Sequence, residues 1–198
     1  MLEFKDKCVI GIDLSASSKN PTGWAILKNQ NVRTNLFYTD NEILEKTVQN
    51  HPALIAIDAP LSLPKNGEFF RKTDKEIVRK GYRVLPPNFP AIKKLTLRAI
   101  NLKKLIEEKT YKAIEVHPTS TRKALQMPLK SWKVIQEILK TLGLKGEIET
   151  RPLTIHEIDA VTAALTAVLH LQRQTELIGD GIEGYIVVPK KRSWKTLT

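Results

Sequence analysis

The sequence is poor in cysteine and has no long apolar run. Cys8 is its only cysteine, which excludes an internal disulfide framework and zinc sites built on cysteine pairs, and which is typical of a reducing compartment. No stretch of about 18 apolar residues occurs, and the opening heptapeptide, Met-Leu-Glu-Phe-Lys-Asp-Lys, does not begin an apolar signal core. We therefore expect a soluble, cytoplasmic protein that does not enter a membrane.

Internal repeats, low-complexity tracts and linkers long enough to separate domains are also absent from the sequence. Apolar residues make up 41% of the 198 positions and charged residues 27%, a composition that excludes a disordered or fibrous chain. We predict one domain at residues 1–188, with an insertion at about residues 66–90, and a basic C-terminal tail at residues 189–198.

Acidic residues are few beside basic ones, 21 against 32, so the formal net charge is +11. The excess is concentrated: residues 65–112 carry +9 and residues 189–198 carry +4, while the other two stretches each sum to −1. This concentration predicts binding of a polyanion, with nucleic acid as the favoured partner. A basic amphipathic helix at residues 91–109 offers membrane binding as an alternative, but its apolar positions recur like an ordinary core-facing stripe, so we expect no membrane partner.

Hydrophobic periodicity predicts an α/β protein with a mixed sheet of about five strands. Strands are expected at residues 9–14, 22–27, 32–38, 53–57, 111–116 and 185–188. Helices are expected at residues 41–49, about 72–80, 91–109, 131–142 and 155–171. The continuous apolar run at residues 53–57 is typical of a central strand that is buried on both faces.

Four carboxylates interrupt apolar segments. Asp13 and Asp58 each close a predicted strand, Glu115 lies within a strand, and Asp159 lies within the last helix. An isolated ionised carboxylate costs several kcal/mol to bury, so each of them needs a partner. Taken singly, Asp13 and Asp58 have a structural explanation as turn or cap residues, but neighbouring strand ends lie about 4.8 Å apart, and two carboxylates there suit a shared cation.

The last predicted helix places Asp159 on its buried side. Thr154 and Glu157 form a Thr-x-x-Glu capping box, which starts the helix at Ile155 and explains Glu157 structurally. Counting onward, Asp159 shares a face with apolar residues. The structural alternative is an aspartate that is hydrogen-bonded to the neighbouring backbone.

Two histidines lie near these carboxylates and are candidates for a supporting role. His117 shares a strand face with Glu115, and His156 lies one turn before Asp159. Each also has an ordinary structural explanation, His117 as a strand-end residue and His156 as an exposed residue of a first helical turn.

Oxygen donors without cysteine or paired histidines favour Mg²⁺ or Mn²⁺ over Zn²⁺. Two such ions, roughly 4 Å apart, can activate water and stabilise the leaving oxygen in phosphodiester hydrolysis. A basic surface beside an acidic metal site is the combination that a nuclease needs. The glycine pattern at residues 179–184 has dinucleotide-binding spacing, but it precedes a strand, so we expect no nucleotide cofactor.

Five segments together resemble one known family: VIGIDLS, PTGWA, IDAPLSLP, EVHP and HEIDA, at residues 9–15, 21–25, 57–64, 115–118 and 156–160. Over about residues 7–188 the chain is similar to the domain-of-unknown-function 429 family, predicted nucleases of the ribonuclease H fold. The resemblance implies a ribonuclease H-like five-stranded mixed sheet of order 3-2-1-4-5, flanked by helices. It implies that Asp13, Asp58 and Asp159 form the metal-binding and catalytic set, as in ribonuclease H and Holliday junction resolvases.

The resemblance also bears on the residues around this set. Glu115 is expected one strand further out, as a fourth catalytic residue or a group that contacts substrate. Within the insertion, four charged residues look like part of the family's site: Arg71, Asp74, Arg79 and Arg83. The candidates for phosphate binding are then Arg71, Arg79, Arg83, Lys190, Lys191 and Arg192.

Two other functions remain open at this point. One is a nucleic-acid-binding module without catalysis, which the basic charge fits equally well. The other is a relative of sugar kinases and actin-like ATPases, which share the fold but bind nucleotide between two such domains. The sequence does not distinguish DNA, RNA, a branched junction or a small phosphorylated molecule as substrate, and it leaves the oligomeric state unknown.

Overall fold

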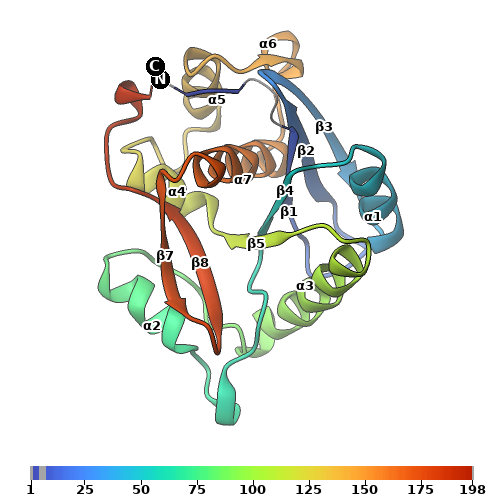
Figure 1. Ribbon diagram of the computed structural model, residues 1–198, viewed down its shortest axis with the longest axis vertical. Coiled ribbons are helices and arrows are strands. Elements are labelled where there is room, and N and C mark those ends of the chain that lie inside the picture. Colours follow the sequence, from blue (N-terminus) through green and yellow to red (C-terminus); the bar gives the residue numbers. More distant parts are fainter. Residues whose placement is uncertain (1, 5–7, 198) are drawn as a thin grey trace.

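A computed structural model describes residues 2–4 and 8–197, which form a mixed sheet with helices on both faces (Figure 1). The strand order is β6-β3-β2-β1-β4-β5-β8-β7. The bounds are β1 Cys8–Asp13, β2 Thr22–Lys28, β3 Asn31–Phe37, β4 Leu54–Asp58, β5 Ala113–Val116, β6 Lys145–Gly146, β7 Thr175–Asp180 and β8 Gly184–Pro189. Strands β1, β4, β5 and β8 are mutually parallel, whereas β1-β2-β3 and β7-β8 are antiparallel.

The helices cover the sheet in two layers. Their bounds are α1 Asp40–Gln49, α2 Lys72–Arg79, α3 Pro90–Glu108, α4 Pro118–Ala124, α5 Trp132–Thr141, α6 Glu147–Thr150 and α7 Ile155–Leu171, with short 3₁₀ turns η1 Lys65–Gly67 and η2 Trp194–Thr196. Helix α7 packs on one face of β1, β2 and β4, and its apolar side chains join the larger core cluster. Residues of α1 and α3 form the second cluster on the opposite face.

Side-chain alternation along β1 assigns its residues to these two layers. Ile10 and Ile12 belong to the cluster under α1 and α3, whereas Val9 belongs to the cluster under α7. Gly11 also faces α7, and a Cβ built there would lie 1.9 Å from the carbonyl oxygen of Ala160. The helix therefore rests directly on the strand backbone, which positions its first turns at the carboxyl end of β1.

The sheet corrects the predicted strand count. The expected order 3-2-1-4-5 forms its middle, but eight strands are present in the described residues instead of about five. Strand β8 corresponds to the expected strand at residues 185–188, whereas β6 and β7 were not expected. The two-residue β6 is too short to show periodicity, and β7 carries Thr175, Glu176 and Asp180 among few apolar residues. Helix α4 was not among the expected helices; Pro118 occupies its first position, where the fixed φ of proline favours helix formation.

The basic C-terminal segment packs on the domain. The backbone N–H groups of Arg192 and Trp194 donate to the carbonyls of Ala124 and Leu125, and Leu197 is buried. Residues 1 and 198, the outer ends of the predicted domain and tail, lie outside the described residues. None of the helices in the described ranges has the length and apolar character needed to cross a membrane.

Candidate active site

Asp13, Asp58 and Asp159 meet at the carboxyl ends of the two central parallel strands. Asp13 ends β1, Asp58 ends β4, and the two are paired in register, so both side chains lie on the α7 side of the sheet. Asp159 lies in the second turn of α7, which rests on that side. Burial and the charges of Asp13 and Asp159 together hold the pKa of Asp58 well above its ordinary value.

Two of these carboxylates have basic partners. His156, from the first turn of α7, donates from Nδ1 to Asp13 Oδ2 at 2.6 Å, and this bond raises the pKa of His156. Arg122 forms an ion pair with Asp159 Oδ1. Burial raises the pKa of Asp159, and Arg122 partly offsets that rise.

Asp58 differs from its two neighbours. Among the residues that the structure describes, its carboxylate has no hydrogen-bond or ion-pair partner. A half-buried carboxylate between two others, without a donor of its own, is an unfavourable arrangement unless a cation or a proton joins it.

Arg122, which sequence reasoning missed, comes from α4. It is 1% exposed, and its guanidinium lies 5.2 Å from the ring centroid of Trp132. Its second terminal nitrogen donates to Thr119 Oγ1 at 3.3 Å, and its Nε is buried without a partner among the described residues. The sequence signal for this residue was Pro118. A proline that follows a strand and suits the first position of a helix predicts a helix there, and Arg122 lies in that helix.

Glu115 lies one strand out from Asp58, as expected, but on the other side of the sheet. It pairs in register with Ile57, whose side chain belongs to the cluster under α1 and α3. Arg71 donates to both of its carboxylate oxygens, and the Leu61 N–H donates to Oε2 at 2.8 Å. Burial raises the pKa of Glu115 while Arg71 lowers it. A catalytic role for Glu115 stays a prediction.

Arg71 has no donor left for a phosphate in this arrangement. Its five N–H groups donate to Asp74, Glu115 and Ser62, and it is 1% exposed. Asp74 completes the arrangement by accepting from the Arg71 backbone N–H at 2.8 Å at the start of α2. Of the other predicted phosphate-binding residues, four are exposed and one is half-buried: Arg79, Arg83, Lys190 and Lys191, and then Arg192, which donates to Gln174.

A cavity of about 200 Å³ joins the two sides of this strand edge. Asp13 and Asp58 line it together with Arg71 and Glu115, and apolar residues from the insertion and α3 form its walls. His117 also lines it and is hydrogen-bonded to Ser120 Oγ at 2.7 Å. Burial, with a smaller effect of Arg122, lowers the pKa of His117 to about 4, so its imidazole is neutral near pH 7.

The donor chemistry of the three aspartates fits a hard divalent cation, although their present arrangement does not. Within residues 2–4 and 8–197, no group of three or more His, Cys, Asp or Glu side chains is arranged to hold a metal ion. Arg122 and His156 instead engage two of the three carboxylates. The partnerless Asp58, with its raised pKa, is the group that a cation would relieve.

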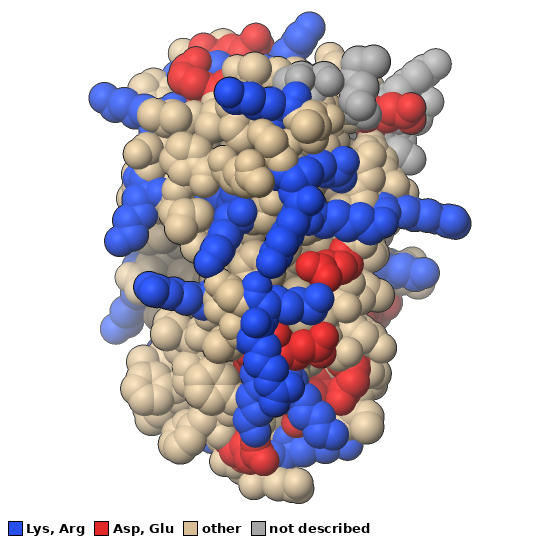
Figure 2. Space-filling view, turned by 90° about the vertical axis from the view of Figure 1, so that its left-hand side faces the viewer, with Lys and Arg blue, Asp and Glu red and all other residues tan. Residues whose placement is uncertain are grey.

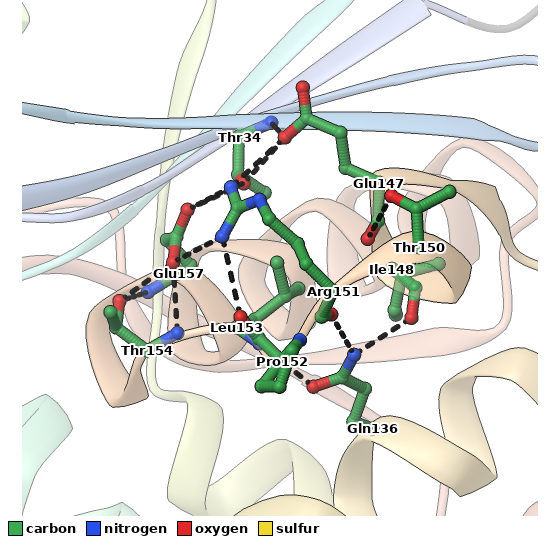
Figure 3. A network of polar contacts seen from close by, with 10 residues as sticks. All are labelled: Thr34, Gln136, Glu147, Ile148, Thr150, Arg151, Pro152, Leu153, Thr154 and Glu157. Atoms are coloured by element: carbon green, nitrogen blue, oxygen red, sulfur yellow. Dashed lines mark hydrogen bonds and ion pairs between the residues drawn. The ribbon is translucent and has the colours of Figure 1, made fainter.

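A separate polar network fixes the first turn of α7 (Figure 3). Arg151 donates to Glu157 Oε1 at 2.6 Å and to Thr34 Oγ1 at 2.7 Å, and Glu147 accepts from Thr34. Glu157 also completes the predicted capping box with Thr154, as expected. Burial would raise the pKa of Glu157, but these donors hold it at about 2. The network ties α7 to β3 and α6, beside the turn that carries His156 and Asp159.

Comparisons with known proteins found one matching family and similar solved structures. Residues 11–180 match the family described as Protein of unknown function (DUF429). The Thermus thermophilus RuvC structure is 17% identical, covers 84% of this chain and 96% of its own, and superposes with a TM-score of 0.50. A second structure, T. thermophilus RuvC in complex with Holliday junction substrate, has the same identity and coverage and a TM-score of 0.49. No match was found among curated proteins.

Proposed function

We propose, from the premise that this chain belongs to the family described as Protein of unknown function (DUF429), that it is a metal-dependent nuclease that hydrolyses phosphodiester bonds. The family description assigns no activity, and the likeness to RuvC concerns the fold alone. The observation that carries the proposal is the meeting of Asp13, Asp58 and Asp159 at one strand edge, with Asp58 lacking a partner among the described residues.

In this proposal the three aspartates hold Mg²⁺ or Mn²⁺, which supplies charge stabilisation and an activated water when bound. His156 holds the Asp13 carboxylate in a fixed orientation through its 2.6 Å hydrogen bond. Asp58 offers both oxygens, since neither is engaged by a described donor. Glu115 and Arg71 form the opposite wall of the cavity, where neutral His117 also lies.

Nucleic acid is the substrate that the charge distribution favours. The exposed cations Arg79, Arg83, Lys190 and Lys191 belong to the two segments that hold the excess positive charge. Lysine and arginine contacts to phosphates provide affinity without sequence preference. The cleavage assay distinguishes DNA, RNA and branched junctions as substrates.

The test is cleavage of end-labelled single-stranded, double-stranded and four-way-junction oligonucleotides, as DNA and as RNA, with Mg²⁺, Mn²⁺ or EDTA. We expect ion-dependent cleavage, and we expect Asp13→Asn to lose it by orders of magnitude while its circular dichroism spectrum and substrate binding persist. Retained cleavage by Asp13→Asn would remove this residue from the catalytic set. No cleavage of any substrate with either ion would overturn the proposal.

A nucleic-acid-binding module without catalysis is the second candidate. The ion pair of Arg122 with Asp159 favours it, because that pair neutralises one of the three carboxylates without a metal. Binding of the same oligonucleotides without cleavage, and without calorimetric binding of Mn²⁺, would select this alternative.

A further inference from the structure

A second cavity lies on the side of α4 that faces the basic segments. It measures about 320 Å³ and is lined by Tyr82, Arg83, Thr119, Ser120, Lys123 and Leu129. The lining holds two cations, two aliphatic hydroxyls and no acidic residue. Hydroxyls and cations without carboxylates are the groups that bind phosphate oxygens in nucleic-acid complexes.

Positive charge from two distant parts of the chain converges beside this cavity. Lys123 of α4 donates to the Gly81 carbonyl at 2.6 Å, and Lys191, which follows β8, donates to the Lys80 carbonyl at 3.3 Å. Lys191 also lies 5.6 Å from the ring centroid of Tyr82. Figure 2 shows this side of the molecule, where Lys and Arg side chains form a nearly continuous column.

Only part of this charge is compensated within the protein. Lys80 pairs with Glu176 at 2.8 Å, but no carboxylate pairs with Arg83, Lys123 or Lys191 among the described residues. The two lysines engage carbonyls near the end of α2, and an ammonium group has three donors, so each keeps donors for another acceptor. Like charges gathered without acidic partners repel one another, and a bound anion relieves that repulsion.

Helix α4 joins this cavity to the candidate active site. Ser120 lines the basic cavity and is hydrogen-bonded to His117, which lines the acidic one. Thr119 accepts from Arg122, which in turn pairs with Asp159. The helix has seven residues and is therefore about 10 Å long, a length that a few nucleotides of one strand span.

We propose that Arg83, Thr119 and Lys123 form a phosphate-binding subsite, here called the α4 subsite, for a backbone phosphate a few nucleotides from the bond held at the three aspartates. This inference rests on the proposed nuclease function, which identifies the ligand as a polynucleotide. It sets the path of the polynucleotide, from the carboxylates across α4 toward Lys191 and the basic column.

The test compares Arg83→Gln/Lys123→Gln with the matched control Lys104→Gln/Lys109→Gln, which removes two exposed positive charges from the far end of α3. Anisotropy titrations use fluorescent single-stranded, double-stranded and junction oligonucleotides in EDTA at several salt concentrations. We expect the subsite pair to bind about tenfold more weakly, with a log–log salt slope flatter by up to about two units on duplex DNA. We expect the control pair to change affinity by less than threefold. Lys123→Arg should keep wild-type affinity, and melting curves should show both double variants folded.

Several outcomes would overturn the subsite. Equal losses in the two double variants would mean that only total charge matters, and wild-type affinity in Arg83→Gln/Lys123→Gln would mean that the cavity binds no phosphate of the polynucleotide. Calorimetry with inorganic phosphate distinguishes the source of the ligand: phosphate binding that needs Arg83 and Lys123, without oligonucleotide binding, would assign the cavity to a small phosphorylated molecule. Because binding is measured in EDTA, absent cleavage would overturn the nuclease proposal alone.

Discussion

At the residue scale, the guanidinium of Arg122 lies beside Asp159, where it competes with a metal ion for the carboxylate. The guanidinium is 1% exposed and engages Oδ1, and no described donor engages Oδ2. A positive charge fixed in this position lowers the free energy of the ionised aspartate when no metal is present. The same charge repels a divalent ion, so it lowers the affinity of the site for the ion.

Arg122→Gln should therefore separate stability from ion affinity. Removing one partner of a buried ion pair leaves the other uncompensated, and we expect a loss of about 3 kcal/mol in the free energy of unfolding in EDTA. We expect calorimetric Mn²⁺ affinity to increase, because a competing positive charge is gone. In Arg122→Gln/Asp159→Asn most of the stability loss should return. Weaker Mn²⁺ binding by the single variant would instead mean that Arg122 holds Asp159 in its ligating orientation.

His156, Asp58 and Asp159 should each make the metal-free protein less stable as pH rises from about 5 to 8, whereas the lowered pKa of His117, about 4, acts with the opposite sign at the acidic end of this range. The folded-state pKa of His156 is raised by Asp13, so its contribution is present below the unfolded pKa near 6.5 and is lost as pH rises through the folded pKa. The raised pKa values of Asp58 and Asp159 act with the same sign, since ionising them costs more in the folded state. Urea unfolding in EDTA across this range measures the slope of stability against pH, and Asp58→Asn should shift that slope toward positive values relative to the wild type. Equal slopes in the two proteins would contradict the raised pKa of Asp58.

At the element scale, the position of α7 decides where Asp159 and His156 lie. The helix contacts β1 at Gly11 and β2 at Gly23, where a built Cβ would lie 1.9 Å and 2.1 Å from carbonyl oxygens of α7. The capping box of Thr154 and Glu157, tied to Arg151, fixes the start of the same helix. Two glycines and one cap thus determine the distance between the helical and the strand carboxylates.

Gly11→Ala should displace this helix. A contact of 1.9 Å with backbone forces a shift, and overpacking of this kind costs about 1–3 kcal/mol or more. We expect a lower midpoint of chemical unfolding and a weaker Mn²⁺ affinity, because Asp159 moves away from Asp13 and Asp58. Gly181→Ala is the matched control, since the nearest atom to its built Cβ is the Tyr185 hydroxyl at 3.9 Å. Unchanged unfolding and ion binding in Gly11→Ala would show that α7 adapts without cost.

The helices and strands differ in how well the local sequence predicts them. The start of α7 was predictable because Thr154 and Glu157 are local, and β1 and β4 were predictable because their apolar runs are continuous. Strand β6 has two residues and forms only because β3 lies beside it, so no local pattern marks it. The partnership of Arg122 with Asp159 joins residues 37 positions apart through α4, which only tertiary packing determines.

At the scale of the whole molecule, opposite charges are separated between two cavities. The acidic cavity lies at the carboxyl ends of β1 and β4, and the basic one lies across α4. The sequence predicted both charges, from carboxylates within apolar segments and from the +9 and +4 stretches. It did not predict that Arg71, from the most basic stretch, is buried against Asp74 and Glu115, because that arrangement depends on where the insertion folds back.

Three basic residues of the packed C-terminal segment allow a test of how the charge of the molecule contributes to oligonucleotide binding. Lys190 and Lys191 are exposed, and Arg192 is held against Gln174 by a 2.8 Å hydrogen bond. Because backbone hydrogen bonds fix this segment to the domain, its charges have a defined place beside the α4 subsite. Replacing all three residues by alanine should weaken oligonucleotide binding and flatten the log–log salt slope by up to about three units on duplex DNA. The reason is that binding releases fewer counterions when fewer phosphates are contacted.

Cleavage at saturating substrate should change little in this triple variant, because these side chains do not line the carboxylate cavity. The matched control replaces Lys104, Lys109 and Lys112, three exposed lysines of α3 and the segment after it, by alanine. If the control flattens the slope as much as the C-terminal variant, binding depends on net charge and not on the position of the C-terminal cations. If the C-terminal variant instead loses turnover at saturating substrate, the C-terminal segment acts on the chemical step. Binding and catalysis would then not be separated between the basic cavity and the acidic cavity.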